Sequence, residues 1–344
     1  MSSEAEHDDL TAMVRSMKTM ASPLRGLLAD LQRTFTPLTD GQLAETPPEL
    51  AKADPGWFGI CVVDTHGRMY EVGDSQQLFT IQTLANPFVY GLALGEHGRD
   101  EVLARVGVAP ANDSFTLSDA NTLTLPNPLV VAGALGLTTL LKGSNATERL
   151  NTILALFRRL TNREVMIDAT LFTSARTTGH HYRALAHFML ARGLITEDVD
   201  EALDLFFQQQ SLLVTCRDLA LMAATLANQG KNPVSGEAVI EPTYVRDILS
   251  VLYTCGMQNT AGTWAYRVGL PAERSVSGAI MAVVPQQLGI AVFSPLLNAQ
   301  GTSVRASKVC EALSQHFNLH AFDPYERKTK LQEAIKNPSL RGGL

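Results

Sequence analysis

The stretch "GAIMAVVPQQLGIAVFSP" (residues 278–295) contains two apolar runs, 278–285 and 288–295, each bounded by Gly or Pro. Short runs of this kind predict β-strands. A helical pattern follows at about 303–317. The C-terminal third of the chain therefore predicts two strands and a closing helix.

A second strand signal lies near the start of the chain. "WFGICVVD" (57–64) and "RMYEV" (68–72) are rich in aromatic and β-branched residues, and His66-Gly67 separates them. This pattern predicts a β-hairpin.

The segment from about 87 to 230 has a largely helical pattern. In "NPLVVAGALGLTTLLKG" (127–143) we expect Asn127 as N-cap, Pro128 at the first helical position and Gly143 as the stop. "TCRDLALMAATLANQG" (215–230) has apolar residues at helical spacing, with Asp218 as a structural first-turn acid. Strands at both ends with helices between them predict an α+β fold, with one sheet beside a helical lobe.

The domain organisation follows from this order of elements. We expect an N-terminal helical segment over 1–40, one domain over 41–317 and a charged, flexible tail over 318–344. Within the domain, the sheet would come from about 55–75 and 276–317, and the helical lobe from about 87–230. The chain shows no internal repeat and no low-complexity linker that would divide it further.

Composition narrows the classes of partner. The chain has 344 residues, of which 45% are hydrophobic and 18% charged, and its net charge is −6. Scattered Lys and Arg residues argue against nucleic acid as a partner. No apolar run reaches the roughly 18–20 residues of a membrane span, and the acidic first residues do not predict a signal peptide. Together with four dispersed cysteines, this predicts a cytoplasmic protein that neither contacts a membrane nor forms disulfides.

No motif in the sequence calls for a cofactor or a metal. The glycine-rich nucleotide motifs and the HExxH zinc motif do not occur. His180 and His181 are adjacent, so on a helix their side chains would diverge by about 100°. We therefore expect neither a cofactor nor a metal ion.

"FTIQTLANPFVYGLAL" (79–94) has a hydroxyl residue, Thr83, three positions before Asn86. In many hydrolases a hydroxyl and a lysine at this spacing act as nucleophile and base, but asparagine is not a base. Asn86-Pro87 is a typical helix start, and proline opposes a helix running through it from Thr83. We expect the helix to begin near Pro87, with Asn86 as N-cap and Thr83 in the preceding turn.

Several collinear blocks resemble one known family. They include "WFGICVVDTHGRMYEVGDSQQLFTIQT" (57–83), "LPNPLVVAGAL" (125–135) and "CRDLALMAATLANQGKNPVSGE" (216–237). Over about residues 40–317 the chain resembles the serine-dependent glutaminases. The resemblance implies a β-lactamase/penicillin-binding-protein-like fold, hydrolysis of glutamine to glutamate and ammonia, and assembly as a dimer or tetramer.

The family's site residues are largely replaced in this chain. Its Q-S-x-S-K motif falls on residues 82–86, so Thr83 stands at the nucleophile and Asn86 at the base. Phe206 and Gln258 stand at two tyrosine positions of the family. The substrate-pocket positions implied by the resemblance are Gln82, Val131, Ala175, Tyr182, Gln258, Arg274, Ser275 and Val276.

The replaced side chains lead to three functional hypotheses. The first is a glutaminase-like protein without measurable glutamine turnover, acting as an oligomeric scaffold, a regulatory subunit or a partner of an active paralogue. The second is a repurposed enzyme or small-molecule binder that uses the same cleft, in which Arg274 would bind a carboxylate or a phosphate. The third is residual glutaminase activity through Thr83. Because the framework blocks match while the pocket residues differ, the sequence favours the first hypothesis.

Overall fold

The computed structural model describes residues 23–111, 124–196 and 198–323. It contains a five-stranded sheet in the order β2-β1-β8-β7-β6, in which every neighbouring pair is antiparallel. These strands are β1 (Gly59–Asp64), β2 (Met69–Gly73), β6 (Ala272–Arg274), β7 (Ala279–Val284) and β8 (Leu288–Phe293). The N- and C-terminal segments thus form one sheet, as the sequence predicts.

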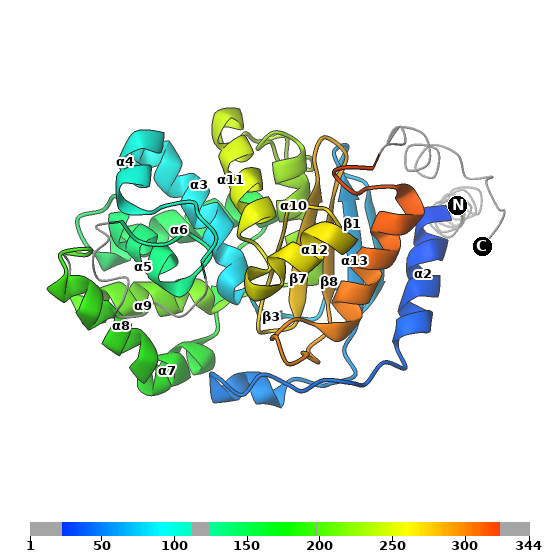
Figure 1. The fold of residues 1–344 in the computed structure, drawn as a ribbon, viewed down its shortest axis with the longest axis horizontal. Helices are drawn as coiled ribbons and strands as arrows, with labels where there is room; N and C mark the ends of the chain where they lie inside the picture. The colour runs from blue at the N-terminus through cyan, green and yellow to red at the C-terminus, as the bar shows by residue number, and fades with distance from the viewer. Residues whose placement is uncertain (1–22, 112–123, 197, 324–344) are drawn as a thin grey trace, which may run out of the picture.

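Helices cover both faces of this sheet (Figure 1). On one face, α2 (Pro23–Phe35) and α13 (Val304–Phe317) pack against residues such as Ile60 and Val292. On the other face, α10 (Cys216–Ala227) packs against residues such as Cys61 and Ala291. Because side chains alternate between the two faces, strands covered on both sides are apolar throughout. This explains the continuous apolar runs at 278–295.

Seven of the other described helices form a lobe beside the sheet (Figure 1). A small sheet, in the order β3-β5-β4, connects the lobe to the main body. It consists of β3 (Phe79–Thr80), β4 (Met166–Ile167) and β5 (Leu212–Val214). The lobe helices are α3 (Asn86–His97), α4 (Arg99–Arg105), α5 (Val131–Leu140), α6 (Ala146–Thr161), α7 (Ala169–Thr178), α8 (His180–Ala191) and α9 (Val199–Gln210).

The remaining elements complete the described chain. They are the 3₁₀ turns η1 (Pro48–Lys52), η2 (Gln82–Ala85) and η4 (Gln258–Thr260), and the helices α11 (Pro242–Thr254) and α12 (Ala261–Arg267). No helix among the described residues has both the length and the apolar character needed to cross a bilayer. The α+β architecture predicted from the sequence is confirmed.

Helix α10 lies unusually close to β8. A Cβ atom added at Gly289 would lie 2.3 Å from the main-chain nitrogen of Ala224. Thr215 and Asp218 form a capping box at the start of α10, and Asp218 also forms an ion pair with Arg163. Asp218 therefore has the structural role that the sequence predicts.

Helix α5 starts later than the sequence predicts, and helix α3 starts close to the predicted position but with a different N-cap. Helix α5 begins at Val131, because the side chain of Asn127 accepts a hydrogen bond from the Leu129 amide and donates one to the Ala109 carbonyl. Helix α3 begins at Asn86, close to the expected position. Asn86 itself has helical dihedral angles, and Ala85 precedes it as N-cap. The prediction of a late start is confirmed, and the prediction of Asn86 as N-cap is wrong.

The predicted domain limits at residues 40 and 318 stay predictions. The tail predicted over 318–344 lies mostly outside the described residues, which end at Asp323.

Candidate active site

Thr83 lies on a tight turn between the small sheet and helix α3. Strand β3 pairs with β5, and the Ile81 amide donates to the Leu212 carbonyl at 2.8 Å. Gln82, the next residue, is 6% exposed and has a φ angle of +53°. Positive φ is costly for a residue with a side chain, and such strain gathers at functional sites. The strained turn holds the half-buried Thr83 three residues before the start of α3.

The Thr83 hydroxyl faces the edge of the main sheet. Its Oγ1 donates a hydrogen bond to the main-chain oxygen of Arg274, at 2.6 Å. Arg274 is the last residue of β6, which pairs only with β7 among the described strands and so forms an edge of the sheet. The candidate nucleophile therefore lies where the helical lobe meets the sheet, with the N-terminus of α3 beside it.

Asn86 is buried in a cluster of neutral amides. It is 2% exposed, and its Oδ1 accepts hydrogen bonds from Nε2 of Gln209 and Nε2 of Gln210, both at 3.2 Å. Oε1 of Gln209 in turn accepts one from the Thr138 hydroxyl at 3.2 Å. None of these side chains titrates near neutral pH. Position 86 thus supplies structure rather than a base.

Gln209 and Gln210 were not among the site residues predicted from the sequence. In "FFQQQS" (206–211) they look like the polar end of a helix, although Gln209 is fully buried and Gln210 is 9% exposed. The resemblance does contain a signal: the block of the glutaminases that has tyrosine at the position of Phe206 reads Y-F-x-Q-C-S, so it has cysteine where this chain has Gln210. This chain has Asn86 in place of the family's lysine and Gln210 in place of its cysteine. The two replacing side chains form a hydrogen bond with each other.

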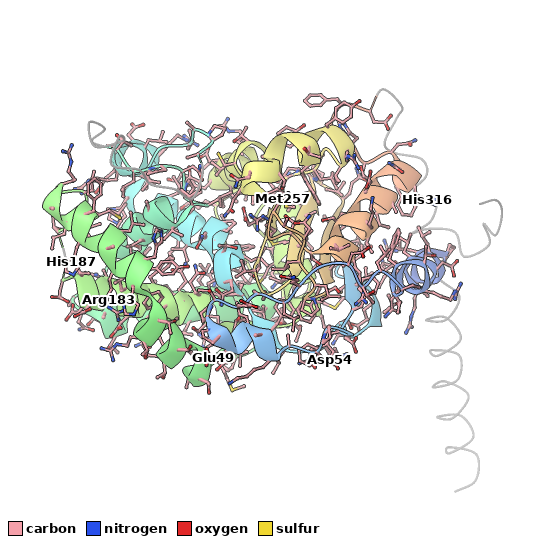
Figure 2. The ribbon with its side chains drawn as sticks, turned by 60° about the horizontal axis from the view of Figure 1, so that its bottom comes forward. Glu49, Asp54, Arg183, His187, Met257 and His316 are labelled. Atoms are coloured by element: carbon pink, nitrogen blue, oxygen red, sulfur yellow. The ribbon has the colours of Figure 1, made fainter. Side chains whose placement is uncertain are left out.

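Arg274 links three segments around Thr83. Its guanidinium donates to the Gly301 carbonyl at 2.6 Å and to Oε1 of Gln258 at 2.7 Å, while its own carbonyl accepts from Thr83. The side chain is 7% exposed. Gln258 follows Met257, which is labelled in Figure 2, and both residues have positive φ angles, +47° and +62°. Arg274 therefore anchors a second strained turn at the site.

The neighbouring residues of β6 and its turn are also buried. Glu273 is fully buried, and its charge, after burial, contributes to raising the pKa of the Cys255 thiol. The hydroxyl of Ser275 lies 2.6 Å from that of Ser277, and the Ser275 amide donates to the Ala279 carbonyl. These bonds fix the main chain that follows Arg274.

A partly enclosed pocket of about 70 Å³ lies next to Gln82. Three of the predicted substrate positions line it, Gln82, Ala175 and Tyr182, together with Phe206, which stands at a tyrosine position of the family. Val131, at the start of α5, and Val276, after β6, are half-buried and do not line this pocket. The full lining consists of Thr46, Pro47, Gln82, Leu171, Ala175, Thr178, Gly179, His181, Tyr182, Phe206, Phe207 and Gln210.

Aromatic rings form one wall of the pocket. The ring centroids of Tyr182 and Phe207 are 5.4 Å apart in an edge-on arrangement, and Phe206 lies 6.1 Å from each of them. Helix α7, which contributes to the lining, also packs against η1, and Figure 2 labels Glu49 on η1. In the described parts of the chain, no group of three or more His, Cys, Asp or Glu side chains is placed to hold a metal ion.

Comparisons with known proteins identify the family. A glutaminase family model matches residues 41–322. The chain is 52% identical to a glutaminase of Trichormus variabilis over 94% of this chain and 95% of that protein. It is 47% identical to a glutaminase of Microcystis aeruginosa over 97% of this chain and all of that protein.

Solved structures agree with this assignment. A probable glutaminase, ybaS, superposes with a TM-score of 0.84 at 32% identity, covering 87% of this chain and 98% of that one. A probable glutaminase from Bacillus subtilis, complexed with 6-diazo-5-oxo-L-norleucine, superposes with a TM-score of 0.79 at 30% identity, covering 85% and 94%. The fold is thus the β-lactamase-like fold of the glutaminases.

These findings overturn the first functional hypothesis. A protein without glutaminase activity was expected from the replaced pocket residues, yet proteins named glutaminase are about half identical to it over almost the whole chain. The motif comparison gave full weight to the missing base. It could not show the strained residue Gln82 or the hydrogen bond that holds the retained Thr83 hydroxyl. On its sequence and its structure, the chain belongs to the glutaminase family.

Proposed function

We propose that this chain is a glutaminase that hydrolyses the side-chain amide of L-glutamine, with Thr83 as its nucleophile. The observation that carries the proposal is the placement of the Thr83 hydroxyl. It lies between the start of α3 and the edge of the main sheet, directly after the strained residue Gln82. Similarity to proteins named glutaminase supports the same activity.

The reaction consists of two acyl-transfer steps. Thr83 Oγ1 attacks the amide carbon of glutamine, and a tetrahedral oxyanion forms. The C–N bond then breaks, the hydroxyl proton passes to the leaving nitrogen, and ammonia departs from a glutamyl ester on Thr83. Water attacks this ester, its hydroxide adds to the acyl carbon, and its remaining proton returns to Oγ1 as glutamate leaves. Atoms and protons balance over the two steps.

The surroundings of Thr83 favour the charged transition state. The N-terminus of α3, a helix of 12 residues, provides partial positive charge beside the site of attack. The Arg274 carbonyl oxygen accepts a hydrogen bond from the Thr83 hydroxyl and so orients it, but a main-chain carbonyl is not a base. The chain's own residues therefore contribute chiefly positioning and electrostatic stabilisation.

Asn86 determines how fast such a site can work. A positioned base contributes roughly 10²–10⁴-fold to a rate, and the amide cluster around Asn86 holds none. In serine hydrolases that lose a member of the catalytic triad, about 10³–10⁴-fold acceleration over water remains. We therefore expect a slow but real glutaminase.

Covalent labelling tests the proposal at the level of the nucleophile. The diazoketone 6-diazo-5-oxo-L-norleucine resembles glutamine in shape and alkylates a nucleophile with loss of nitrogen. After incubation, peptide mass spectrometry should find the adduct on Thr83 and find none in Thr83→Ala. Thr83→Ser keeps the hydroxyl and should be labelled. An adduct at another residue, or no adduct at all, would remove Thr83 as the nucleophile.

A further inference from the structure

A second pocket, of about 570 Å³, lies away from Thr83. Three segments line it: one face of α11, the end of α10 and the turn between β7 and β8 (Figure 1). Its volume falls within the roughly 300–1,000 Å³ of sites that bind small organic molecules. The proposed hydrolysis of glutamine uses none of its described lining residues.

The pocket and the candidate nucleophile lie toward opposite ends of strand β7. Arg274, whose carbonyl accepts from Thr83, pairs with Ile280 near the start of β7. Pro285, which lines the pocket, directly follows the end of β7. At about 3.3 Å per residue, Ile280 and Pro285 are roughly 16 Å apart along the strand. A ligand in this pocket would therefore not occupy the place of glutamine.

Helix α11 presents an apolar stripe to the pocket. Val245, Leu249 and Tyr253 follow one another at intervals of four residues, and all three line the pocket. Residues spaced in this way lie on the same face of a helix. The adjoining side of the helix, with Ile248 and Leu252, is buried, and α11 packs against α3. The helix is thus held in place by one side and offers the other to a ligand.

Arg246 is the one ionised side chain among the described lining residues. It is 75% exposed, and its Nε lies 3.8 Å from Oδ1 of Asp247. Asp247 is bound more closely by Arg99, whose Nε and Nη2 both donate to its Oδ2. The guanidinium of Arg246 therefore keeps donors for a further anion, and its planar fork matches a carboxylate.

The hydroxyl groups beside Arg246 donate to their own helix. Ser250 Oγ donates to the Arg246 carbonyl at 2.8 Å, and Thr254 Oγ1 donates to the Ser250 carbonyl at 2.9 Å. The side chains of Gln229 and Gln286, by contrast, form no hydrogen bond with another described residue. The donors left for a ligand are thus one guanidinium and two carboxamides.

Both glutamines have left-handed main-chain angles. The φ angle is +57° at Gln229 and +64° at Gln286, and the Gln286 amide donates to the Ala227 carbonyl at 2.9 Å. Two asparagines at the ends of α6 and α13 also have positive φ. Every other described non-glycine residue with positive φ lies at the candidate active site. Because such strain gathers at functional sites, it singles out this pocket as a second one.

We propose that this pocket binds a small monocarboxylate with an apolar body. The apolar stripe of α11 contacts the body, and the guanidinium of Arg246 pairs with the carboxylate. A second copy of the chain fits this surface less well, because it would bring a second arginine and no acid from the same patch. The proposal goes beyond the proposed hydrolysis and does not depend on it.

Calorimetry with 4-phenylbutyrate tests the proposal in the unchanged protein. Acetate has the carboxylate without the apolar body, and 4-phenylbutan-1-ol has the apolar body without the charge. We expect 4-phenylbutyrate to bind roughly tenfold more tightly than acetate, because it buries apolar surface. It should bind roughly threefold more tightly than the alcohol, because an exposed ion pair contributes modestly.

Two variants locate the binding. Arg246→Met should abolish the preference for 4-phenylbutyrate over the alcohol. Leu249→Glu should abolish binding of 4-phenylbutyrate, because it places a negative charge on the apolar stripe. Arg158→Met is the matched control: Arg158 is 56% exposed, lies 3.4 Å from Glu164 and lines neither pocket, so its loss should change nothing. Urea midpoints show whether each variant is folded.

Four results would overturn the proposal. The first two are equal affinity of the unchanged protein for 4-phenylbutyrate and acetate, and equal affinity for 4-phenylbutyrate and the alcohol. The third is an equal effect of Arg246→Met and Arg158→Met. The fourth is a change of oligomeric state in Leu249→Glu when the unchanged protein does not bind 4-phenylbutyrate, since the surface would then be an interface between copies.

The ligand comparison in the unchanged protein does not depend on how any variant folds. Binding of 4-phenylbutyrate as expected, without release of ammonia from glutamine, would refute the proposed hydrolysis and leave this proposal intact. Hydrolysis without that binding would do the reverse.

Discussion

The hydroxyl of Thr83 lies 2.6 Å from the main-chain oxygen of Arg274, although 191 residues separate them in the chain. One residue belongs to the turn that leads into the helical lobe, and the other ends an edge strand of the main sheet. The hydrogen bond therefore joins the two halves of the fold at the candidate nucleophile. It also shows why neither local stretch could reveal the site alone.

Replacing Asn86 by lysine should accelerate the enzyme. Asn86→Lys introduces an amine one helical turn from Thr83, and we expect kcat to rise by about 10²-fold or more. The variant also loses the two hydrogen bonds to Asn86 and buries a charge, so it should unfold at lower urea concentration. Ammonia release and urea denaturation measure the two effects.

Asn86→Leu separates these effects. It loses the same amide hydrogen bonds but gains no base, so it should be destabilised without becoming faster. If Asn86→Lys and Asn86→Leu have the same kcat, position 86 does not control activation of the nucleophile.

Arg274→Met should lower activity through the two segments that the guanidinium holds. The variant keeps the main-chain oxygen that accepts from Thr83 but leaves Oε1 of Gln258 and the Gly301 carbonyl without that donor. Each lost bond costs about 1–3 kcal/mol of unfolding free energy. We expect lower stability and at least a tenfold fall in kcat/KM for glutamine, measured by urea unfolding and steady-state kinetics.

Gln258→Met is the control for this prediction, because it disturbs the same contacts less than Arg274→Met does. It removes only one of the two guanidinium bonds, so its effect on stability should be smaller than that of Arg274→Met. An Arg274→Met protein with unchanged kinetics would show that the guanidinium does not position the site.

The cysteines should be unreactive in the folded protein. Burial raises the pKa of the Cys310 thiol to about 12 and that of Cys216 well above its usual value, while burial followed by the charge of Glu71 raises that of Cys61. Burial also raises the pKa of Cys255. Because the thiolate is the reactive form, a disulfide reagent at mildly alkaline pH should label native protein very slowly and denatured protein at all four positions.

Tyr90, together with the buried thiols, predicts a loss of stability in alkali. Burial, followed by the charge of Asp247, raises the pKa of Tyr90 to about 12. A group with a raised pKa in the folded state stabilises the fold fully below its unfolded pKa, and this contribution falls as pH rises above that value. Urea midpoints should therefore decrease from about pH 9 upwards, toward about pH 12. A midpoint that stays constant over this range would contradict the raised pKa values.

Helices and strands that depend on local sequence patterns could be predicted from the sequence. The hairpin of β1 and β2, the strands β7 and β8, and the start of α10 at Thr215 follow from apolar runs, turn residues and a capping box. Strand β6 was missed because it contains Glu273 and Arg274, which look like surface residues. Both are buried by contacts that only the assembled fold creates.

The site was only partly predictable for a similar reason. The motif comparison placed Thr83 and Arg274 at one predicted site, and the structure joins them by a hydrogen bond. It interpreted Asn86 only as the loss of a catalytic base, because it compared one position at a time. The partner of Asn86, Gln210, lies 124 residues away, and the pair is visible only in three dimensions.

Release of ammonia from L-glutamine, compared between the unchanged protein and Thr83→Ala, tests the central claim most directly. Thr83→Ala removes the hydroxyl that donates to Arg274 and leaves the strained turn, α3 and the pocket in place. The account predicts slow, saturable ammonia release by the unchanged protein and a fall to the uncatalysed rate in Thr83→Ala. Ammonia release that is equal in the two proteins, or absent from both, would contradict it.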